Sequence, residues 1–210
     1  KSRGLGDVYK RQSLASSLKQ GVMDALRALR RVEVLRWLTL LQFSDLMLDV
    51  LLGFLALYFV DVVGATPARA GIAVALLTGM GLLGNLVLIP ALERVRGLRY
   101  LRLSVVATSV LFPAFLLVPG AGAKLVLLGL LGLSTAGWYP ILKAQLYSAM
   151  PGQSGTVLAV GNVFGLVGGL IPLGLGLIAE RFDLGVTMWL LLLGPVALLI
   201  GIPKRVEESA

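Results

Sequence analysis

Two aspartates lie inside an apolar run that is long enough to cross a bilayer. The run extends from Leu38 to Val60, and Asp45 and Asp49 are one helical turn apart, so they share a helix face. At ~1.5 Å of rise per residue they lie roughly 12 Å and 18 Å from Trp37, near the middle of a hydrocarbon layer about 30 Å thick. Carboxylates at this depth usually face protein or a water-filled cavity. We expect them to couple a proton or cation, or to balance a cationic solute. The structural alternative is a carboxylate that a neighbouring helix satisfies or that stays protonated.

The second group of candidate residues is Trp138, Tyr139 and Lys143. Lys143 is the only lysine inside a predicted span. It could pair with Asp45, or extend to the nearby interface as long cationic side chains do. Pro140 would kink the helix beside the two aromatic residues and free a backbone carbonyl. The aromatic side chains would then line a solute cavity or pack against lipid.

These residues belong to a chain with the composition of an integral membrane protein. Of its 210 residues 57% are hydrophobic and 14% are charged, whereas a soluble domain is about 45–50% apolar and about 25% charged. The absence of cysteine and histidine excludes disulfides, thiolate metal sites and the commonest general base. We therefore expect a protein of the lipid bilayer that is not an enzyme and has no metal or cofactor. The net charge of +8 fits the positive-inside bias of membrane proteins, so no nucleic-acid partner is expected.

Six apolar stretches approach or exceed the roughly 20 residues that a spanning helix needs. They cover roughly 37–60, 70–91, 100–118, 125–147, 156–179 and 186–202. Turn-forming or charged residues separate them. The sequence thus predicts an all-α fold, a transmembrane six-helix bundle over residues 37–203 with a short tail at 204–210.

Positive charge is distributed unevenly between the two sides of these spans. One side has Lys19, Arg27, Arg30, Arg31, Arg36, Arg94, Arg96, Arg99, Arg102, Lys204 and Arg205, and the other has Arg69, Lys124 and Arg181. The positive-inside rule places both ends of the segment in the cytoplasm of a multi-pass cell-membrane protein. An even number of spans also requires both ends on the same side.

Small, amide and aromatic residues have structural roles in this interpretation. Glycines at four-residue spacing predict close helix packing in the fifth span, and further glycines do so in the second. Asn85 and Asn162 are expected to form interhelical hydrogen bonds. Four aromatic residues near predicted span ends fit an interfacial belt: Trp37, Tyr58, Tyr100 and Tyr147.

The first residues of the chain differ from the rest. Ser2 to Gln12 is similar to the in-frame translation of a transposase adapter used to prepare sequencing libraries; an ordinary basic loop is the alternative. Such segments are left out of fold reasoning. Residues 1–12 contain four basic and one acidic side chain, so without them the net charge falls from +8 to +5. We treat 1–12 as an adapter-derived artefact and 13–36 as a basic amphipathic cytoplasmic connection.

The connection from Ile89 to Arg99 resembles the acidic-Arg-x-Gly-basic loop of the major facilitator superfamily, which follows the second helix of each six-helix half. Glu93, Arg94 and Gly97 match its acidic, arginine and glycine positions, with one extra residue before the glycine and Leu98 in place of a basic residue. Residues 150–184, with a Pro-Gly-x-x-Gly loop and a glycine-rich helix, are similar to the eleventh helix of such transporters. The resemblance covers about residues 34–204 and fits the C-terminal half, spans seven to twelve of twelve.

The resemblance implies a secondary transporter that works by alternating access. Each half of this fold consists of two inverted three-helix repeats, with the substrate site near the midplane, and the first helix of each repeat lines the cavity. Those two helices contain Asp45 and Asp49 in one repeat and Trp138, Tyr139 and Lys143 in the other.

The family also implies the partners and the rest of the machinery. The substrate would be a small molecule or an ion, the partner would be the missing N-terminal half of the same protein, and Glu93, Arg94 and Gly97 would form a cytoplasmic gating loop. The alternative is a non-transporting six-span membrane protein, such as a channel, scaffold or sensor subunit.

Overall fold

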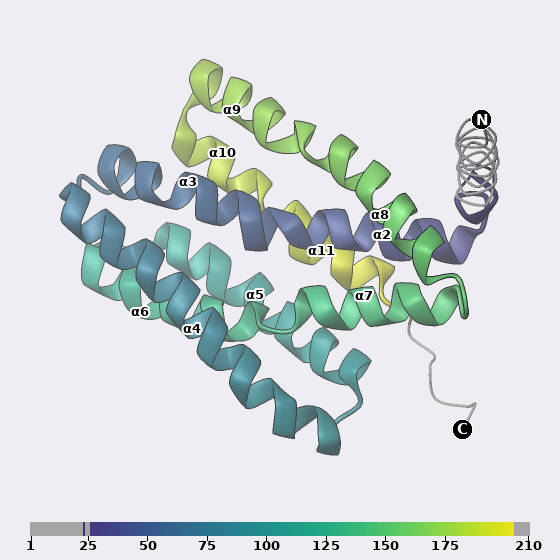
Figure 1. The fold of residues 1–210 in the computed structure, drawn as a ribbon. Coiled ribbons are helices and arrows are strands. Elements are labelled where there is room, and N and C mark those ends of the chain that lie inside the picture. Colours follow the sequence, from purple (N-terminus) through teal and green to yellow (C-terminus); the bar gives the residue numbers. More distant parts are fainter. Residues whose placement is uncertain (1–22, 24–25, 204–210) are drawn as a thin grey trace, which may run out of the picture.

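The protein is an all-α membrane protein whose helices form one elongated bundle (Figure 1). The computed structural model describes residue 23 and residues 26–203. Six helical segments are long and apolar enough to cross a membrane: Val32–Val62, Pro67–Arg94, Gly97–Leu117, Ala121–Ala149, Ser154–Phe182 and Leu184–Gly201. The predicted ranges fall within these to one residue, so the six-span prediction is confirmed.

Two boundaries of the predicted organisation need comment. The first span begins at Val32, so the last residues assigned to the connection at 13–36 belong to a membrane helix instead. The segment 1–12, predicted to derive from an adapter, and the tail at 204–210 lie outside the described residues.

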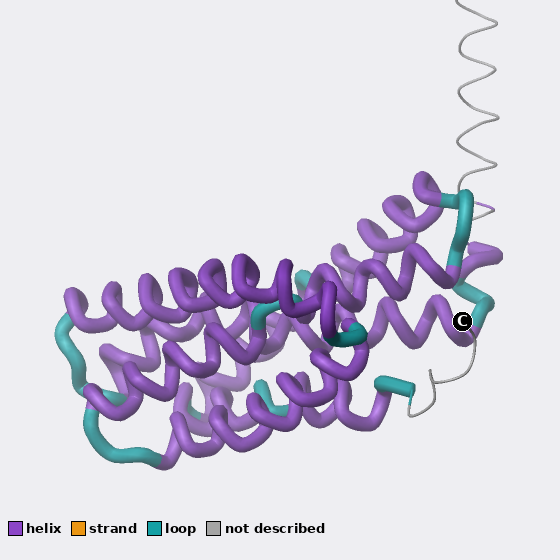
Figure 2. Tube along the Cα trace, turned by 90° about the horizontal axis from the view of Figure 1, so that it is seen from below, coloured by secondary structure: helices purple, strands orange, loops and turns teal. Residues whose placement is uncertain are grey.

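Four of the six spans are interrupted along their length, whereas the second and third are the continuous helices α4 (Pro67–Arg94) and α5 (Gly97–Leu117). The first consists of α2 (Val32–Asp45), the π-helical η1 (Leu46–Val50), α3 (Leu51–Leu57) and the π-helical η2 (Tyr58–Val62). The fourth consists of α6 (Ala121–Thr135) and α7 (Trp138–Ala149). The fifth consists of α8 (Ser154–Gly168) and α9 (Leu170–Phe182), and the sixth of α10 (Leu184–Leu190) and α11 (Leu193–Gly201). Figure 2 shows loop segments midway along the bundle as well as at its two ends.

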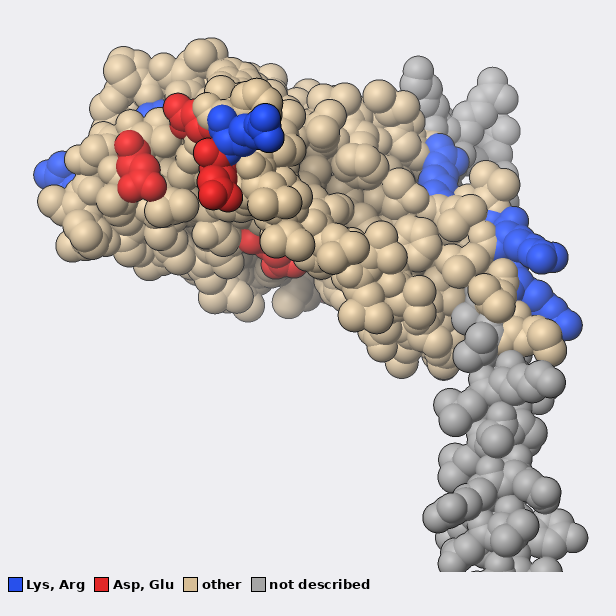
Figure 3. Space-filling view, turned by 90° about the horizontal axis from the view of Figure 1, so that it is seen from above, with Lys and Arg blue, Asp and Glu red and all other residues tan. Residues whose placement is uncertain are grey.

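The two ends of the bundle differ in charge. The basic end, where α2 begins and α11 ends, contains Arg30, Arg31, Arg36, Arg94, Arg96, Arg99 and Arg102. The acidic end, at the opposite end of the same helices, contains Asp61, Glu180 and Asp183, and Figure 3 shows acidic side chains gathered over it. The difference agrees with the charge asymmetry predicted from the sequence.

The closest helix packing in the bundle joins α4 and α6. A Cβ atom added to Gly132 would lie 2.6 Å from the Leu77 carbonyl oxygen, and one added to Gly84 would lie 2.6 Å from the Ala136 Cβ. Both positions therefore need glycine so that the two backbones can approach. The predicted small-residue packing of the second span is confirmed at Gly84, whereas Gly79 faces open space.

A buried lysine connects three spans at the acidic end. Lys124 in α6 is only 6% exposed, and its ammonium donates hydrogen bonds to the carbonyl oxygens of Phe115 (2.6 Å) and Leu116 (3.0 Å) and to the Tyr58 hydroxyl (3.1 Å). The two carbonyls belong to the last turn of α5, where a cation complements the helix dipole. Its three donors are all used, so Lys124 has a structural role.

Two arginines have a matching role at the basic end. The Arg36 Nε of α2 donates a 2.6 Å hydrogen bond to the Gly201 carbonyl at the last residue of α11, and the Arg102 guanidinium of α5 donates to the Pro203 carbonyl. The end of the sixth span is thereby fixed to the first and third spans.

Substitution of Gly132 tests the close packing of α4 and α6. We expect Gly132→Val to lower the free energy of unfolding by about 1–3 kcal/mol, because the added side chain meets the α4 backbone. SDS titration in mixed micelles would measure it. Gly79→Val is the matched control, since a Cβ there has nothing within 4 Å; equal losses in both variants would contradict the packing argument.

Substitution of Lys124 tests the connection at the acidic end. Lys124→Met leaves two helix-end carbonyls without a donor in an apolar environment, so we expect a loss of about 1–3 kcal/mol in unfolding free energy. Lys143→Met, at a half-buried lysine of the same span, should lose clearly less in the same titration. A neutral effect at Lys124 would show that the three contacts do not stabilise the fold.

Candidate functional site

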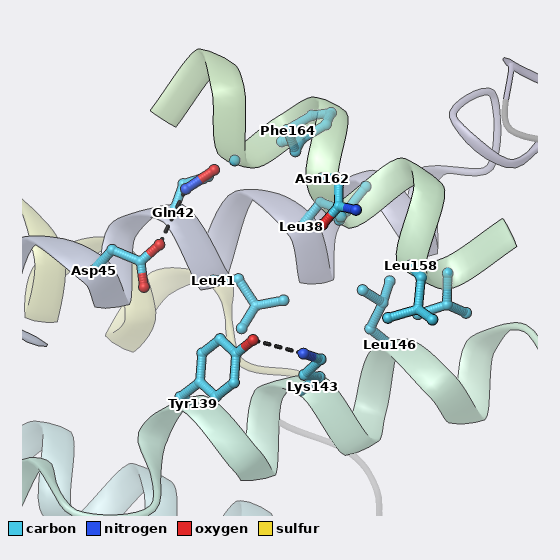
Figure 4. A pocket seen from close by; sticks show the side chains of 13 residues that line it. Leu38, Leu41, Gln42, Asp45, Tyr139, Lys143, Leu146, Leu158, Asn162 and Phe164 are labelled. Carbon is cyan, nitrogen blue, oxygen red and sulfur yellow. Dashed lines mark hydrogen bonds between the residues drawn. The ribbon is translucent and has the colours of Figure 1, made fainter. Parts of the chain in front are cut away.

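A polar cavity of about 190 Å³ lies between the first, fourth and fifth spans. Three helices supply its walls: α2, α7 and α8 (Figure 4). Its polar lining residues are Gln42, Asp45, Tyr139, Lys143 and Asn162, and its apolar ones include Leu38, Leu41 and Phe164. Three of the five residues predicted to contact substrate or coupling ion therefore line one cavity.

Asp45 forms the acidic wall of the cavity. It is the last residue of α2, directly before the π-helical turn η1, and π-helical turns within α-helices are frequent at functional sites. Its side chain is half-buried and accepts a 3.1 Å hydrogen bond from Gln42 Nε2, one turn earlier. The carboxylate thus has one neutral partner and keeps further acceptor capacity toward the cavity.

Lys143 forms the basic wall on α7. Its ammonium donates a 2.6 Å hydrogen bond to the Tyr139 hydroxyl and lies 4.8 Å from the centre of that ring. The ion pair with Asp45 that the sequence allowed is not formed, because each charged group has turned to a neutral partner on its own helix (Figure 4).

The third wall is α8, which contributes two glycines beside the side chains of Val157, Leu158, Asn162 and Phe164. Gly161 and Gly165 of α8 line the cavity, and a Cβ atom added to either would meet nothing within 4 Å. The sequence predicted these glycines to bring helices into contact, and that prediction is wrong for this pair. Close approach occurs at Gly168 instead, where an added Cβ would clash with the Gln42 side chain. Gly161 and Gly165 leave the cavity unfilled on this side.

Trp138 was predicted to join this site but is placed elsewhere. Its side chain is fully buried, and Nε1 donates a 2.9 Å hydrogen bond to Ser104 Oγ of α5. The residue lines a neighbouring cleft of about 440 Å³ together with Tyr139 and Pro140. Trp138 is therefore a packing residue between the third and fourth spans.

The break in the fourth span lies directly before Trp138. Gly137 adopts a left-handed conformation (φ 78°) and is the residue directly before α7, so the helical geometry of α6 is interrupted there. Two side chains satisfy the backbone groups released there: Asn85 Oδ1 accepts from the Gly137 N–H at 3.0 Å, and the Tyr100 hydroxyl donates to the Ala136 carbonyl at 3.2 Å. The predicted interhelical hydrogen bond of Asn85 is confirmed, whereas Pro140 lies in the first turn of α7, where it needs no kink.

A Gly-Asn pair occurs in both the second and the fifth span. In α4 the pair is Gly84–Asn85, and in α8 it is Gly161–Asn162. The first pair packs directly against the fourth span, and the Asn85 side chain accepts the hydrogen bond from the Gly137 N–H there. The second pair borders the cavity, and Asn162 makes no hydrogen bond to a described residue. The predicted interhelical bond of Asn162 is thus not formed in this structure.

Asp49 and the predicted gating loop lie outside the cavity. Asp49 is exposed in η1 and makes no hydrogen bond to a described residue. Glu93 and Arg94 are exposed at the end of α4, and Gly97 is the first residue of α5, where an added Cβ would lie 3.5 Å from Ile141. The predicted gating loop therefore leads into α5, and at Gly97 it lies next to Ile141 of α7.

Sequence reasoning also missed residues that the structure shows to be important. Lys124 was counted as a surface charge, and Tyr58 was assigned to an aromatic belt, yet each is buried and they bond to one another. Trp37 is buried as well. Tyr58 contacts Phe59 edge-on and Phe115 at a tilt, and Phe115 stacks on Phe59 and Phe112. These contacts join the first and third spans, so the sequence gives no local signal for them.

Searches against protein-family models, curated proteins and solved structures give no match to this chain.

The two asparagines provide a matched test of the break in the fourth span. Asn85→Ala leaves the Gly137 N–H unpaired in the bundle, so we expect the unfolding free energy to fall by about 1–3 kcal/mol. Asn162→Ala removes an amide without a described partner and should change it by less than about 0.5 kcal/mol. Both would be measured by SDS titration, and equal effects would refute the assigned role of Asn85.

Proposed function

We propose that the protein is a secondary active transporter of a small solute, coupled to a proton or another ion, and that the chain forms the C-terminal six-helix half of a major facilitator fold. The observation that carries the proposal is the cavity in which Asp45, Tyr139 and Lys143 meet. These residues come from the first and fourth spans, the two that would begin the inverted repeats and line the substrate pathway.

The packing of the spans supports two inverted repeats. The second span packs against the fourth through α4 and α6, and the fifth packs against the first through α8 and α2. In two repeats of three spans the fifth span is the counterpart of the second, and the first is the counterpart of the fourth. The contact between the second and fourth spans is therefore equivalent to the contact between the fifth and first. The Gly-Asn pair occupies the equivalent spans, in α4 and α8. A repeat of this kind is typical of transporters whose substrate site lies between the repeats.

Exposed polar groups along the spans support a second half. Asp49 is exposed in the middle of the first span, and Tyr139 is 46% exposed beside the cavity. A carboxylate at this depth needs a protein or water environment. A matching six-helix half over this face would supply it and would close the cavity on the remaining side.

The mechanism would use the difference between the two Gly-Asn interfaces. The interface of α4 with α6 is closely packed along its length, whereas α8 contacts α2 and α7 but leaves a cavity between them at Gly161 and Gly165. Movement of one half against the other would open the cavity to each side in turn, and Asp49 and Asp45 would be the carboxylates that bind the coupling ion. Glu93, Arg94 and Gly97 would stabilise the state closed at the basic end, which we place in the cytoplasm.

Cysteine accessibility tests alternating access directly, because the chain contains no cysteine. Gly165→Cys would be introduced into the complete protein, with cysteines outside this chain replaced, and reconstituted in oriented vesicles. We expect a membrane-impermeant maleimide to label it from either side, and an imposed proton or sodium gradient to move the labelling from one side to the other. Asp45→Asn and Asp49→Asn should each abolish that shift while leaving expression intact.

The control and the contrary outcomes separate the rival class. Gly174→Cys lies on the same span outside the cavity, so its labelling should not respond to the gradient. Labelling of Gly165→Cys from both sides that does not shift under any gradient would indicate a channel. Labelling from one fixed side under every gradient would indicate a scaffold or sensor subunit.

A further inference from the structure

The cavity between α2, α7 and α8 contains one carboxylate and one ammonium that do not bind each other. Asp45 has Gln42 as its partner and Lys143 has Tyr139. Opposite charges in a medium of low dielectric constant attract strongly, and both side chains line the same space of about 190 Å³. Their separation leaves a dipolar site with one negative and one positive wall.

Both groups that line this space keep hydrogen-bonding capacity that no described residue uses. An ammonium has three donors, and Lys143 uses one for the Tyr139 hydroxyl. The carboxylate of Asp45 accepts one hydrogen bond, from Gln42, and has acceptor positions left. The side-chain amide of Asn162 borders the same cavity and makes no hydrogen bond to a described residue, so it can both donate and accept.

Size and wall chemistry restrict the ligand further. The part of the site between α2, α7 and α8 is about 190 Å³, less than the roughly 300–1,000 Å³ of pockets for drug-sized ligands, so a solute that contacts both charged walls there has to be small. Gly161 and Gly165 present backbone on one side, and Leu38 and Leu41 present apolar side chains on another. This lining accommodates a short carbon chain between two polar ends.

We infer that the cavity binds a small zwitterion, a solute with one ammonium and one carboxylate joined by a short carbon chain. The ligand's ammonium would bind Asp45, and its carboxylate would bind Lys143 and the Tyr139 hydroxyl. Such a ligand replaces the missing ion pair by two charge-assisted hydrogen bonds, which are stronger than neutral ones. This inference rests on the proposed function, for which it names the substrate class.

Protection of a cysteine in the cavity wall tests the inference. Gly161→Cys would be placed in the complete protein and its maleimide labelling rate measured with glycine, β-alanine and γ-aminobutyrate, which differ in the distance between their charges. Butyrate and butylamine are the matched probes with one charge each. We expect at least one zwitterion to slow labelling at a concentration about ten-fold or more below that needed for either single-charge probe.

Charge removal distinguishes the roles of the two walls. Asp45→Asn and Lys143→Gln should each weaken protection by the effective zwitterion about ten-fold to one-hundred-fold. Asp45→Asn should weaken butylamine and spare butyrate, and Lys143→Gln should do the reverse. Asp61→Asn and Arg69→Gln neutralise charges at the acidic end, outside this cavity, and should leave protection unchanged.

The outcomes also separate this inference from the proposed function. It is overturned if no zwitterion protects better than both single-charge probes, or if loss of Lys143 leaves zwitterion protection intact. If labelling of Gly165→Cys alternates between the two sides while zwitterions fail, transport stands and this substrate class does not. If zwitterions protect while accessibility never alternates, the binding site stands and the transporter does not.

Discussion

Inside a bilayer every backbone donor and acceptor must find its partner within the protein, because the hydrocarbon offers none. The interruptions of this bundle follow that constraint. Where the fourth span breaks at Gly137, an asparagine and a tyrosine from neighbouring spans satisfy the released N–H and carbonyl groups. Where α5 ends, the Lys124 ammonium takes its last carbonyls. Among the described residues no buried side-chain nitrogen or oxygen lacks a partner, so the polar groups needed for function have to lie at the cavity or on the exposed surface.

The same small-residue pattern produces two different interfaces in this fold. In the second span glycine allows α4 and α6 to touch, and the neighbouring asparagine is used to stabilise the break opposite it. In the fifth span the corresponding glycine and asparagine face a cavity. The two glycines differ in their surroundings, because a Cβ on Gly84 would meet Ala136 and Leu133 whereas one on Gly161 would meet nothing within 4 Å. Closed and open versions of one arrangement therefore coexist in a single bundle.

Hydropathy and charge were sufficient to predict the six spans and the asymmetry of the two ends, because both depend on composition averaged over many residues. The cost of charge within an apolar helix singled out Asp45, Asp49 and Lys143, and the aromatic pair beside Pro140 added Trp138 and Tyr139, but only three of these five residues line the cavity. Direction was not predictable in the same way. Trp138 is adjacent to Tyr139 in sequence yet packs against α5, and Lys124 lies at a span end yet is buried. The partners of Asp45 and Lys143 could not be deduced either. The sequence allows a direct ion pair between them, and it also allows the hydrogen bonds to Gln42 and Tyr139 that the structure shows.

The charged groups and the glycines that line the cavity lie on different helices. The charged groups of the cavity lie on α2 and α7, whereas its two glycines lie on α8. A single methyl group added at Gly161 or Gly165 would narrow the cavity without moving either charged group, since nothing lies within reach of the new atom. If the cavity binds a solute as we propose, substitutions on α8 could therefore alter the solute length that it accepts while leaving its charge preference unchanged.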